Sequence, residues 1–423
     1  MHTLAVILLT AATTALIFLV AINFVTAEKR MQRRPKRLYT LRDGDFRRAM
    51  GVLLGPAILP GNQITTLING NAIFPAMLAA LRGAQHTVCF ETFIYWSGGI
   101  GQAFADALVV AVGRGVRVHV LLDWIGTRRM DPRLLNQLRD NGVEVQIYHP
   151  LSWYHVGRLN NRTHRKLLVV DGSVGFTGGV GIAPQWTGNA QDAGHWRDTH
   201  FRIAGPVVAQ MQAVFLDNWI KSTGSVLHGD DYFPKLQSVG EMDAQMFGSS
   251  PTGGSESMHL MFLLAITAAK RSIDITSSYF VPDDMTLQAL VSAARRGVRV
   301  RILVPGRITD APSLRRASQA KWGGLLRAGV EIHEYQPTMM HAKIVTVDQY
   351  WTSVGSANFD NRSFRLNDEA NLNVFSDALA QEQLLQFEKD LSLARPVSLR
   401  SWRRRPLRRR LHEFFVLLIR SQL

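Results

Sequence analysis

Residues 164–171 read HRKLLVVD and residues 341–348 read HAKIVTVD, so the pattern HxKxxxxD occurs twice in this chain of 423 residues. In both copies the apolar run after the lysine is typical of a buried β-strand. Side chains at positions i and i+2 of a strand point to the same face, so each histidine should lie beside its lysine. One isolated copy would favour an ordinary strand with a surface histidine and lysine, but two copies predict a duplicated chain with a shared site.

The sequence around the motifs repeats as well. RGVRV occurs at 114–118 and again at 296–300, and NGVEV at 141–145 is echoed by AGVEI at 328–332. Each half reads as an apolar strand, an alanine-rich helix, a strand, a second helix and a further strand. This alternation predicts an α/β fold with two mixed-sheet halves related by a pseudo-twofold axis and with the active site between them.

The composition shifts along the chain predict its division into segments. A breaker-rich stretch at 248–254 separates the two halves. We expect a transmembrane anchor at 1–27, a basic juxtamembrane linker at 28–50, a first half at 51–225, a linker at 226–257, a second half at 258–395 and a basic amphipathic tail at 396–423.

The paired motifs supply the groups that phosphodiester cleavage needs without a metal. One imidazole can attack phosphorus while the other donates a proton to the leaving oxygen, because imidazole titrates near neutral pH. Lysine ammonium groups can stabilise the nonbridging oxygens. His164, Lys166, His341 and Lys343 are therefore the predicted catalytic residues, with no metal and no organic cofactor.

At this point the chain resembles the phospholipase D superfamily, and most closely the bacterial cardiolipin synthases. The stretch Gly355–Phe364, followed by Asn367 and Glu369, is similar to the continuation of the second motif in those enzymes. So are Glu91–Tyr95 and Tyr279–Asp283. The resemblance covers roughly residues 60 to 395.

The resemblance implies roles for the motif residues. It implies a phosphohistidine intermediate on His164, with His341 as the general acid, although these two roles could be exchanged. It also implies that Asp171 and Asp348, which end the motifs, are chiefly structural and cap their strands.

Two further acids are implied to orient the histidine rings, Asp198 and Glu369. For Asp198 a surface salt bridge with the adjacent Arg197 is an open alternative. The resemblance also predicts that Asn358, 17 residues after His341, contacts phosphate. The equivalent position in the first half is Gly181, so the two halves should bind phosphate differently, with a backbone amide of the turn at 178–181 as a substitute.

The ends of the chain point to a membrane. Leu4 to Val25 is an apolar run long enough to cross a bilayer, and a cleaved signal peptide is the alternative. Of the net charge of +15, +6 falls in residues 28–48 and +7 in residues 400–423, leaving a nearly neutral body. The basic cluster after the apolar run predicts a single-pass protein of the inner membrane with its catalytic body in the cytoplasm.

The basic tail pairs arginines with the apolar residues 414–419, which suits an anionic bilayer surface, although packing of these residues on the protein core is an alternative. The single cysteine, Cys89, excludes an intramolecular disulfide and a cysteine-based zinc cluster.

The sequence thus predicts a phosphatidyltransferase that joins two phosphatidylglycerol molecules into cardiolipin and glycerol. The expected partners are anionic phospholipids, especially phosphatidylglycerol, and the membrane. A phospholipase D hydrolase that releases phosphatidic acid is the nearest alternative. A membrane-tethered nuclease is less favoured because the body carries no basic stripe, so no nucleic-acid partner is expected. A lipid-binding scaffold is disfavoured because both His/Lys pairs are intact. The acceptor alcohol, the acyl preference and the oligomeric state stay open.

Overall fold

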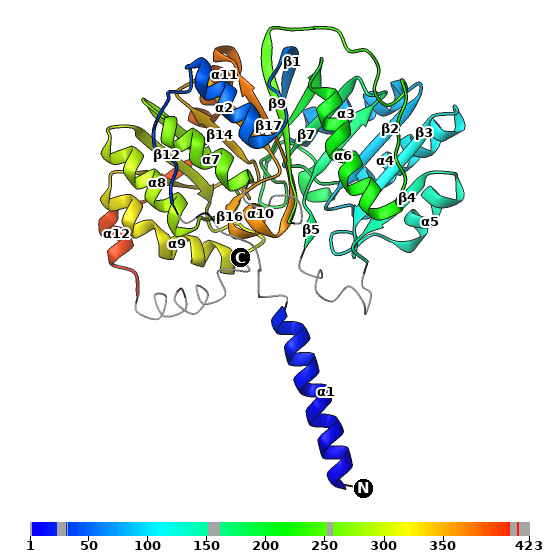
Figure 1. The fold of residues 1–423 in the computed structure, drawn as a ribbon, viewed down its shortest axis with the longest axis horizontal. Helices are drawn as coiled ribbons and strands as arrows, with labels where there is room; N and C mark the ends of the chain where they lie inside the picture. Colours follow the sequence, from blue (N-terminus) through cyan, green and yellow to red (C-terminus); the bar gives the residue numbers. More distant parts are fainter. Residues whose placement is uncertain are drawn as a thin grey trace.

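The computed structural model describes residues 2–22, 31, 33–150, 161–251, 257–406 and 413. Two α/β lobes lie side by side, and Figure 1 shows the first half of the chain in cyan and green and the second in yellow and orange. The predicted α/β class is therefore confirmed.

The segment before the second half contains α1 (His2–Ile22), α2 (Gly44–Leu54), β1 (Leu59–Ile68), α3 (Asn69–Gly83), β2 (Thr87–Thr92), α4 (Gly99–Gly113), β3 (Arg117–Asp123), α5 (Pro132–Asp140), β4 (Glu144–Tyr148), β5 (Arg162–Thr163), β6 (Lys166–Val170), β7 (Val174–Gly178), the 3₁₀ helix η2 (Pro184–Trp186), β8 (Thr199–Ala204) and α6 (Val208–Thr223).

The rest of the described chain contains β9 (Met242–Ser249), α7 (Ser257–Ala268), β10 (Ser272–Thr276), β11 (Phe280–Val281), α8 (Asp284–Arg295), β12 (Arg299–Pro305), α9 (Pro312–Arg327), β13 (Glu331–Tyr335), β14 (Ile344–Val347), β15 (Trp351–Gly355), β16 (Phe359–Asp360), α10 (Asn361–Arg365), β17 (Asn367–Phe375), α11 (Asp377–Ser392), β18 (Ala394–Pro396) and α12 (Leu399–Arg403).

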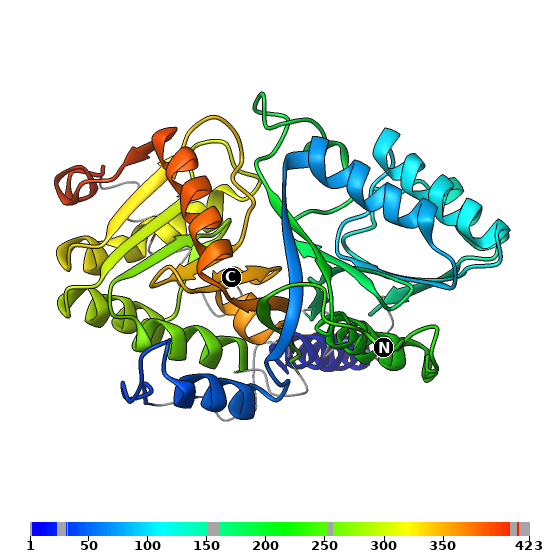
Figure 2. The same cartoon turned by 90° about the horizontal axis from the view of Figure 1, so that it is seen from above.

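One continuous sheet runs through both halves. Its order is β18-β13-β12-β10-β14-β15-β17-β9-β1-β8-β7-β6-β2-β3-β4, with β5 paired to β17 and a separate β11–β16 pair. From the central antiparallel pair β1 and β9 outward, the strands follow in equivalent order on both sides. Figure 2 shows the long blue strand β1 between the two lobes. This symmetry of the sheet is what a duplicated chain should produce.

The repeated RGVRV sequence has a structural reason. Gly115 and Gly297 adopt φ angles of 90° and 89°, a left-handed conformation that glycine adopts without steric cost. Each turn ends a helix and starts a strand. In the first half this strand, β3, pairs in parallel with β2, and in the second half β12 pairs in parallel with β10. The same registers, Thr87 opposite Arg117 and Ser272 opposite Arg299, recur in the two halves.

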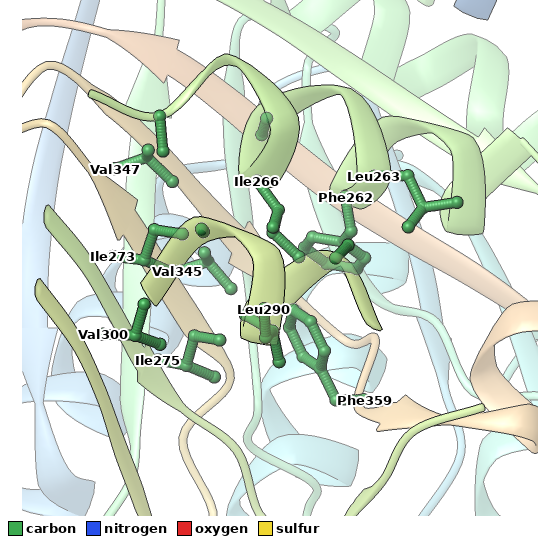
Figure 3. Packing of buried hydrophobic residues seen from close by; sticks show 14 of the residues in the cluster. Phe262, Leu263, Ile266, Ile273, Ile275, Leu290, Val300, Val345, Val347 and Phe359 are labelled. Carbon is green, nitrogen blue, oxygen red and sulfur yellow. The ribbon is translucent and has the colours of Figure 1, made fainter. Parts of the chain in front are cut away.

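Helices cover both faces of the sheet in each half. In the second half α7 and α8 pack on one face, where Ile266 and Leu290 meet Ile275 and Val345 (Figure 3). On the opposite face Phe387 of α11 packs with buried residues that include Leu303 and Ala342. Burial on both faces explains why the motif strands β6 (KLLVV) and β14 (IVTV) are apolar almost without alternation.

Two segments that we predict as linkers contain folded elements. The amphipathic helix α2 crosses residue 50, the predicted end of the juxtamembrane linker, and buries Phe46 and Met50 in the core of the second half. Strand β9 lies within 226–257 and pairs with β17 in the centre of the sheet. Tertiary pairing outweighs the weak local signal of β9, whose sequence MDAQMFGS mixes polar and apolar residues.

The predicted membrane elements are described only in part. The apolar run 4–25 continues beyond α1 into residues outside the described ones, and most of the tail at 407–423 lies outside them too. None of the helices in the described part of the chain was found long and apolar enough to cross a membrane.

Candidate active site

His164 lies between β5 and β6 and is bound by a carboxylate of the other half. Its Nδ1 is 3.0 Å from both carboxylate oxygens of Glu369, on β17. The backbone N–H of His164 donates to the carbonyl oxygen of Asp368 at 2.9 Å. Both the ring and the backbone of this histidine are therefore fixed by the second half.

His341 has the reciprocal arrangement. Its Nδ1 is 2.8 Å from Oδ2 of Asp198, which stands just before β8 in the first half. Its backbone N–H donates to the carbonyl oxygen of Arg197 at 2.7 Å. Because β7–β8 and β15–β17 pair in the same register, Asp198 and Glu369 occupy equivalent positions, and the two halves exchange their carboxylates.

Both motif lysines are buried next to their histidines, as the i, i+2 spacing predicts. Lys166 Nζ donates to the carbonyl oxygen of His164 at 2.7 Å, and Lys343 Nζ donates to that of His341 at 2.6 Å. Lys343 Nζ also lies 3.2 Å from Nδ1 and 3.3 Å from Nε2 of the His341 ring. The charge of Lys343 also acts on Lys166 and His164, so the two motifs form one electrostatic site.

Burial controls the ionisation of this site. It lowers the pKa of His164 to about 4 and, together with the charge of Lys343, lowers the pKa of Lys166 to about 7. Burial also lowers the pKa of Lys343 to about 8. For His341, burial and the charge of Lys343 lower the pKa. At neutral pH the His164 ring is therefore uncharged, and the pKa of each lysine lies close to the pH of the solution.

The two orienting carboxylates stay ionised despite their burial. Burial would raise the pKa of Glu369, but its interactions with His164, including their hydrogen bond, and the charge of Lys166 hold this pKa below its ordinary value. The pKa of Asp198 is lowered in the same way, with His341 and Lys343 outweighing burial. A carboxylate at Nδ1 fixes the tautomer with Nδ1–H and leaves the lone pair on Nε2.

Asp171 and Asp348 follow directly after β6 and β14, and their carboxylates bind the backbone at the starts of β2 and β10. The Asp171 carboxylate accepts backbone N–H groups of residues 85, 86 and 87 at 2.7 to 3.2 Å. The Asp348 carboxylate accepts those of residues 270, 271 and 272 at 2.6 to 3.0 Å. These contacts tie the end of each motif to the neighbouring strand.

Asn358 and Gly181 differ in their surroundings. Asn358 is 3% exposed, and within the described residues its Oδ1 atom has no hydrogen-bond partner. At Gly181 a Cβ atom would lie 2.9 Å from Cβ of Ile94 and 3.2 Å from the ring of Trp186. An asparagine would therefore not fit at Gly181 without displacing its neighbours.

The surface salt bridge considered for Asp198 and Arg197 is wrong. Asp198 is 1% exposed and faces His341, while the Arg197 guanidinium makes two hydrogen bonds, at 3.0 and 2.8 Å, to the Asp390 carboxylate of α11. Neighbouring residues of an extended strand point to opposite faces, and the sequence gives no sign that Asp390 lies behind Arg197.

The structure adds aromatic and hydroxyl groups that the sequence did not single out. Trp186 Nε1 donates to Asp198 at 2.8 Å, and Ser363 Oγ donates to Glu369 at 2.7 Å, so each carboxylate has a second donor. The ring centroid of Trp196 lies 5.3 Å from that of His341, and the ring centroid of Phe93 lies 5.4 Å from that of His164. Spacing alone could not locate these residues, because each contact depends on the packing of distant elements.

A duplicated α/β sheet with one site built from both His/Lys motifs is the arrangement expected of the phospholipase D superfamily. Comparison with known proteins identifies the family within that superfamily. The family described as cardiolipin synthase, PLD-like domain, matches residues 77–219 and 262–391. Cardiolipin synthase A of Pseudomonas putida is 37% identical over 354 residues, which are 83% of this chain and 73% of that protein. Cardiolipin synthase 1 of Bacillus cereus is 35% identical over 376 residues, which are 86% of this chain and 73% of that protein.

Solved structures share the fold. The crystal structure of phosphatidylserine synthase from Haemophilus influenzae superposes with a TM-score of 0.70 at 15% sequence identity, covering 90% of this chain and 100% of that one. The chain belongs to the PLD-like cardiolipin synthase family, a branch of the phospholipase D superfamily.

Proposed function

We propose that the protein is a phosphatidyltransferase that converts two molecules of phosphatidylglycerol into cardiolipin and glycerol. The observation that carries this proposal is the pair of buried histidines, each with a lysine beside it and a carboxylate from the opposite half on Nδ1. The family relationship supplies the substrate class, since the curated relatives are cardiolipin synthases.

In the first step Nε2 of His164 attacks the phosphorus of phosphatidylglycerol. The bond from phosphorus to the glycerol headgroup breaks, and glycerol leaves with a proton from Nε2 of His341. Lys166, Lys343 and the Asn358 amide stabilise the charge on the nonbridging oxygens. Entry of the anionic phosphate raises the pKa of both lysines and of His341, which favours their protonated forms.

In the second step the headgroup hydroxyl of another phosphatidylglycerol replaces glycerol. His341, now neutral, takes the proton of this hydroxyl, the oxygen attacks phosphorus, and the bond to His164 breaks. Glu369 and Asp198 keep the two rings in their reactive tautomers throughout. In this mechanism Asp171 and Asp348 have structural roles and take no part in the reaction.

We further propose that the enzyme works at the inner membrane, held by a single span at residues 4–25 with the catalytic body in the cytoplasm. The apolar run and the basic residues after it support this proposal. The segment boundaries given above belong to the same proposal. Extraction of membranes with alkaline carbonate should leave the full chain in the pellet and release a chain that lacks residues 1–27.

The reaction is tested by incubating the full chain and its His164→Ala variant with labelled phosphatidylglycerol in liposomes. Cardiolipin and glycerol from the unchanged chain alone are the expected result. Phosphatidic acid as the main product would replace the proposal with a hydrolase. Absence of turnover by the unchanged chain would contradict both readings.

A further inference from the structure

A polar cavity lies at the outer edge of the second half. Its volume is about 290 Å³, and α9, β13, β18 and α12 form its walls. Two strands, β12 and β10, separate β13 from β14, the strand that carries Lys343's motif. At roughly 4.8 Å per strand, the cavity stands on the order of 15 Å from that strand. It is therefore separate from the candidate active site.

Arginine dominates the lining of this cavity, which we call the arginine pocket; its lining residues are Arg307, Arg315, Gln319, Trp322, Glu334, Arg395, Pro396, Val397, Ser401, Trp402 and Arg405. Four of these are arginines and one is a glutamate.

Two of the four arginines already have carboxylate partners. Arg315 pairs with Glu334, and Arg405 pairs with Glu413 at 3.1 Å. For Arg307 and Arg395, which are exposed, the described part of the chain provides no ion pair. After this pairing the pocket keeps two positive charges, carried by Arg307, which follows β12, and by Arg395 of β18, so its ligand should be an anion.

The pocket also has a fixed apolar wall. Trp402 of α12 donates its Nε1–H to the carbonyl oxygen of Gln319 at 2.7 Å, and the Arg405 guanidinium stacks 4.1 Å from the Trp402 ring centroid. A Cβ atom at Gly323 would lie 2.3 Å from that ring, so only glycine allows α12 to approach α9 this closely. Figure 1 shows α12, in red, beside α9. The site is therefore built from packed elements.

We propose that the arginine pocket binds the phosphate diester headgroup of an anionic phospholipid that is not the one being converted. Guanidinium groups recognise phosphate oxygens in a bidentate manner, and the tryptophan wall suits the less polar part of a headgroup. Arg400 and Arg403 of α12 are exposed next to the pocket and add charge toward an anionic surface. Such binding would dock the outer edge of the second half on the lipid surface that contains the substrate.

The test uses the full chain in neutral detergent micelles, with His164→Ala to prevent turnover. Isothermal titration with dihexanoyl-phosphatidylglycerol counts the binding sites. The pocket variant carries Arg307→Gln and Arg395→Gln, and the control variant carries Arg82→Gln and Arg139→Gln, two exposed arginines of the first half. Inorganic phosphate serves as a second probe, and cardiolipin synthesis is measured separately with His164 intact.

We expect two lipid sites in the parent and control chains, and at least a tenfold loss of affinity at one site in the pocket variant. Cardiolipin synthesis at saturating substrate should be unchanged by the pocket substitutions, so failure of the proposed function would be seen in a different assay. Equal affinities in pocket and control variants would overturn the site. Tight binding of inorganic phosphate that displaces the lipid would assign the pocket to a free anion and overturn the lipid proposal.

Discussion

At the scale of single residues, each histidine of the candidate site depends on a carboxylate that its own half does not provide. The sequence predicted that Asp198 and Glu369 orient histidines, but it gave no pairing. The structure joins Glu369 to His164 and Asp198 to His341. This exchange follows from the pseudo-twofold arrangement, which no local pattern encodes.

Replacing Glu369 with glutamine should therefore disable His164 without removing its side chain. The amide cannot stabilise positive charge that develops on the ring, and it does not enforce the tautomer with Nδ1–H. We expect kcat to fall by about 100-fold or more. Steady-state synthesis of cardiolipin measures this effect, with Glu382→Gln on the exposed side of α11 as the control. Equal losses in the two variants would show that Glu369 does not act through His164.

Lys166, which we propose acts in catalysis, has a buried charge that lowers the stability of the fold. Burial and repulsion from Lys343 lower its pKa to about 7, from an ordinary value of 10.5. The folded state thus disfavours its charge, and this penalty is complete below about pH 7 and disappears as the pH approaches 10.5.

Lys166→Met should consequently lower activity by about 100-fold or more while raising the melting temperature by about 2 °C or more at pH 6.5. The gain should shrink at pH 9.5. Thermal unfolding of the variant, of the parent and of the exposed control Lys389→Met at both pH values checks this sign. A lower melting temperature for Lys166→Met at pH 6.5 would contradict the proposed penalty.

At the scale of elements, the aspartates that end the two motifs link each motif strand to a neighbouring strand. Asp171 and Asp348 have φ angles of 50° and 53°, and each carboxylate accepts three backbone N–H groups of a neighbouring strand. Asparagine tolerates this left-handed backbone but cannot accept as many hydrogen bonds and has no charge.

Asp171→Asn should thus destabilise the protein by about 2 kcal/mol and leave kcat per folded molecule unchanged. Melting curves and activity normalised to the folded fraction separate the two effects, with Asp230→Asn at an exposed position as the control. Loss of kcat at an unchanged melting temperature would instead place Asp171 in the chemistry.

The elements also show why part of the fold could not be predicted. The apolar strands and the glycine turns of the repeat could be predicted from the sequence, because both depend on local residue types. Strand β17 reads NDEANLNVF and is buried throughout, although its sequence is largely polar. The side-chain amides of Asn371 and Asn373 donate hydrogen bonds across the sheet, to Ser353 Oγ and to Gln245 Oε1. Only the pairing with β15 and β9 supplies these partners, so the strand has no local signature.

At the scale of the whole molecule, duplication places two equivalent motifs in one site while the surroundings make them unequal. Asn358 Oδ1 is buried without a hydrogen-bond partner among the described residues, whereas Ile94 and Trp186 crowd the equivalent position, Gly181, in the first half. These steric surroundings support the prediction that the two halves bind phosphate differently. The membrane anchor and the basic tail remain predictions, since the end of the anchor and most of the tail lie outside the described residues.

The shared burial of the two motifs leads to a prediction about the enzyme's pH profile. The value of kcat/KM reports groups of the free enzyme, in which His164 must be neutral to attack and Lys166 must be protonated to stabilise charge. His164, with a pKa of about 4, sets the acid limb, and Lys166, with a pKa of about 7, contributes to the alkaline limb. His341 must also be protonated as the general acid, and its pKa is lowered, so the alkaline limb begins below the pKa of Lys166. The rate should therefore be at least as high at pH 5.5 as at pH 7, fall below about pH 4 as His164 is protonated, and fall further above about pH 7 as Lys166 loses its proton.

An ordinary exposed histidine would place the acid limb near 6.5, so activity at pH 5.5 decides between the two cases. Initial rates at low substrate, with fluorescence spectra to verify that the protein stays folded at each pH, give the measurement. Loss of most activity between pH 7 and 5.5 would mean that the His164 ring is more solvated, or more strongly paired with Glu369, than its burial implies. Retention of activity at pH 5.5 would support a reaction carried out by His164 in the buried site that the two halves form together.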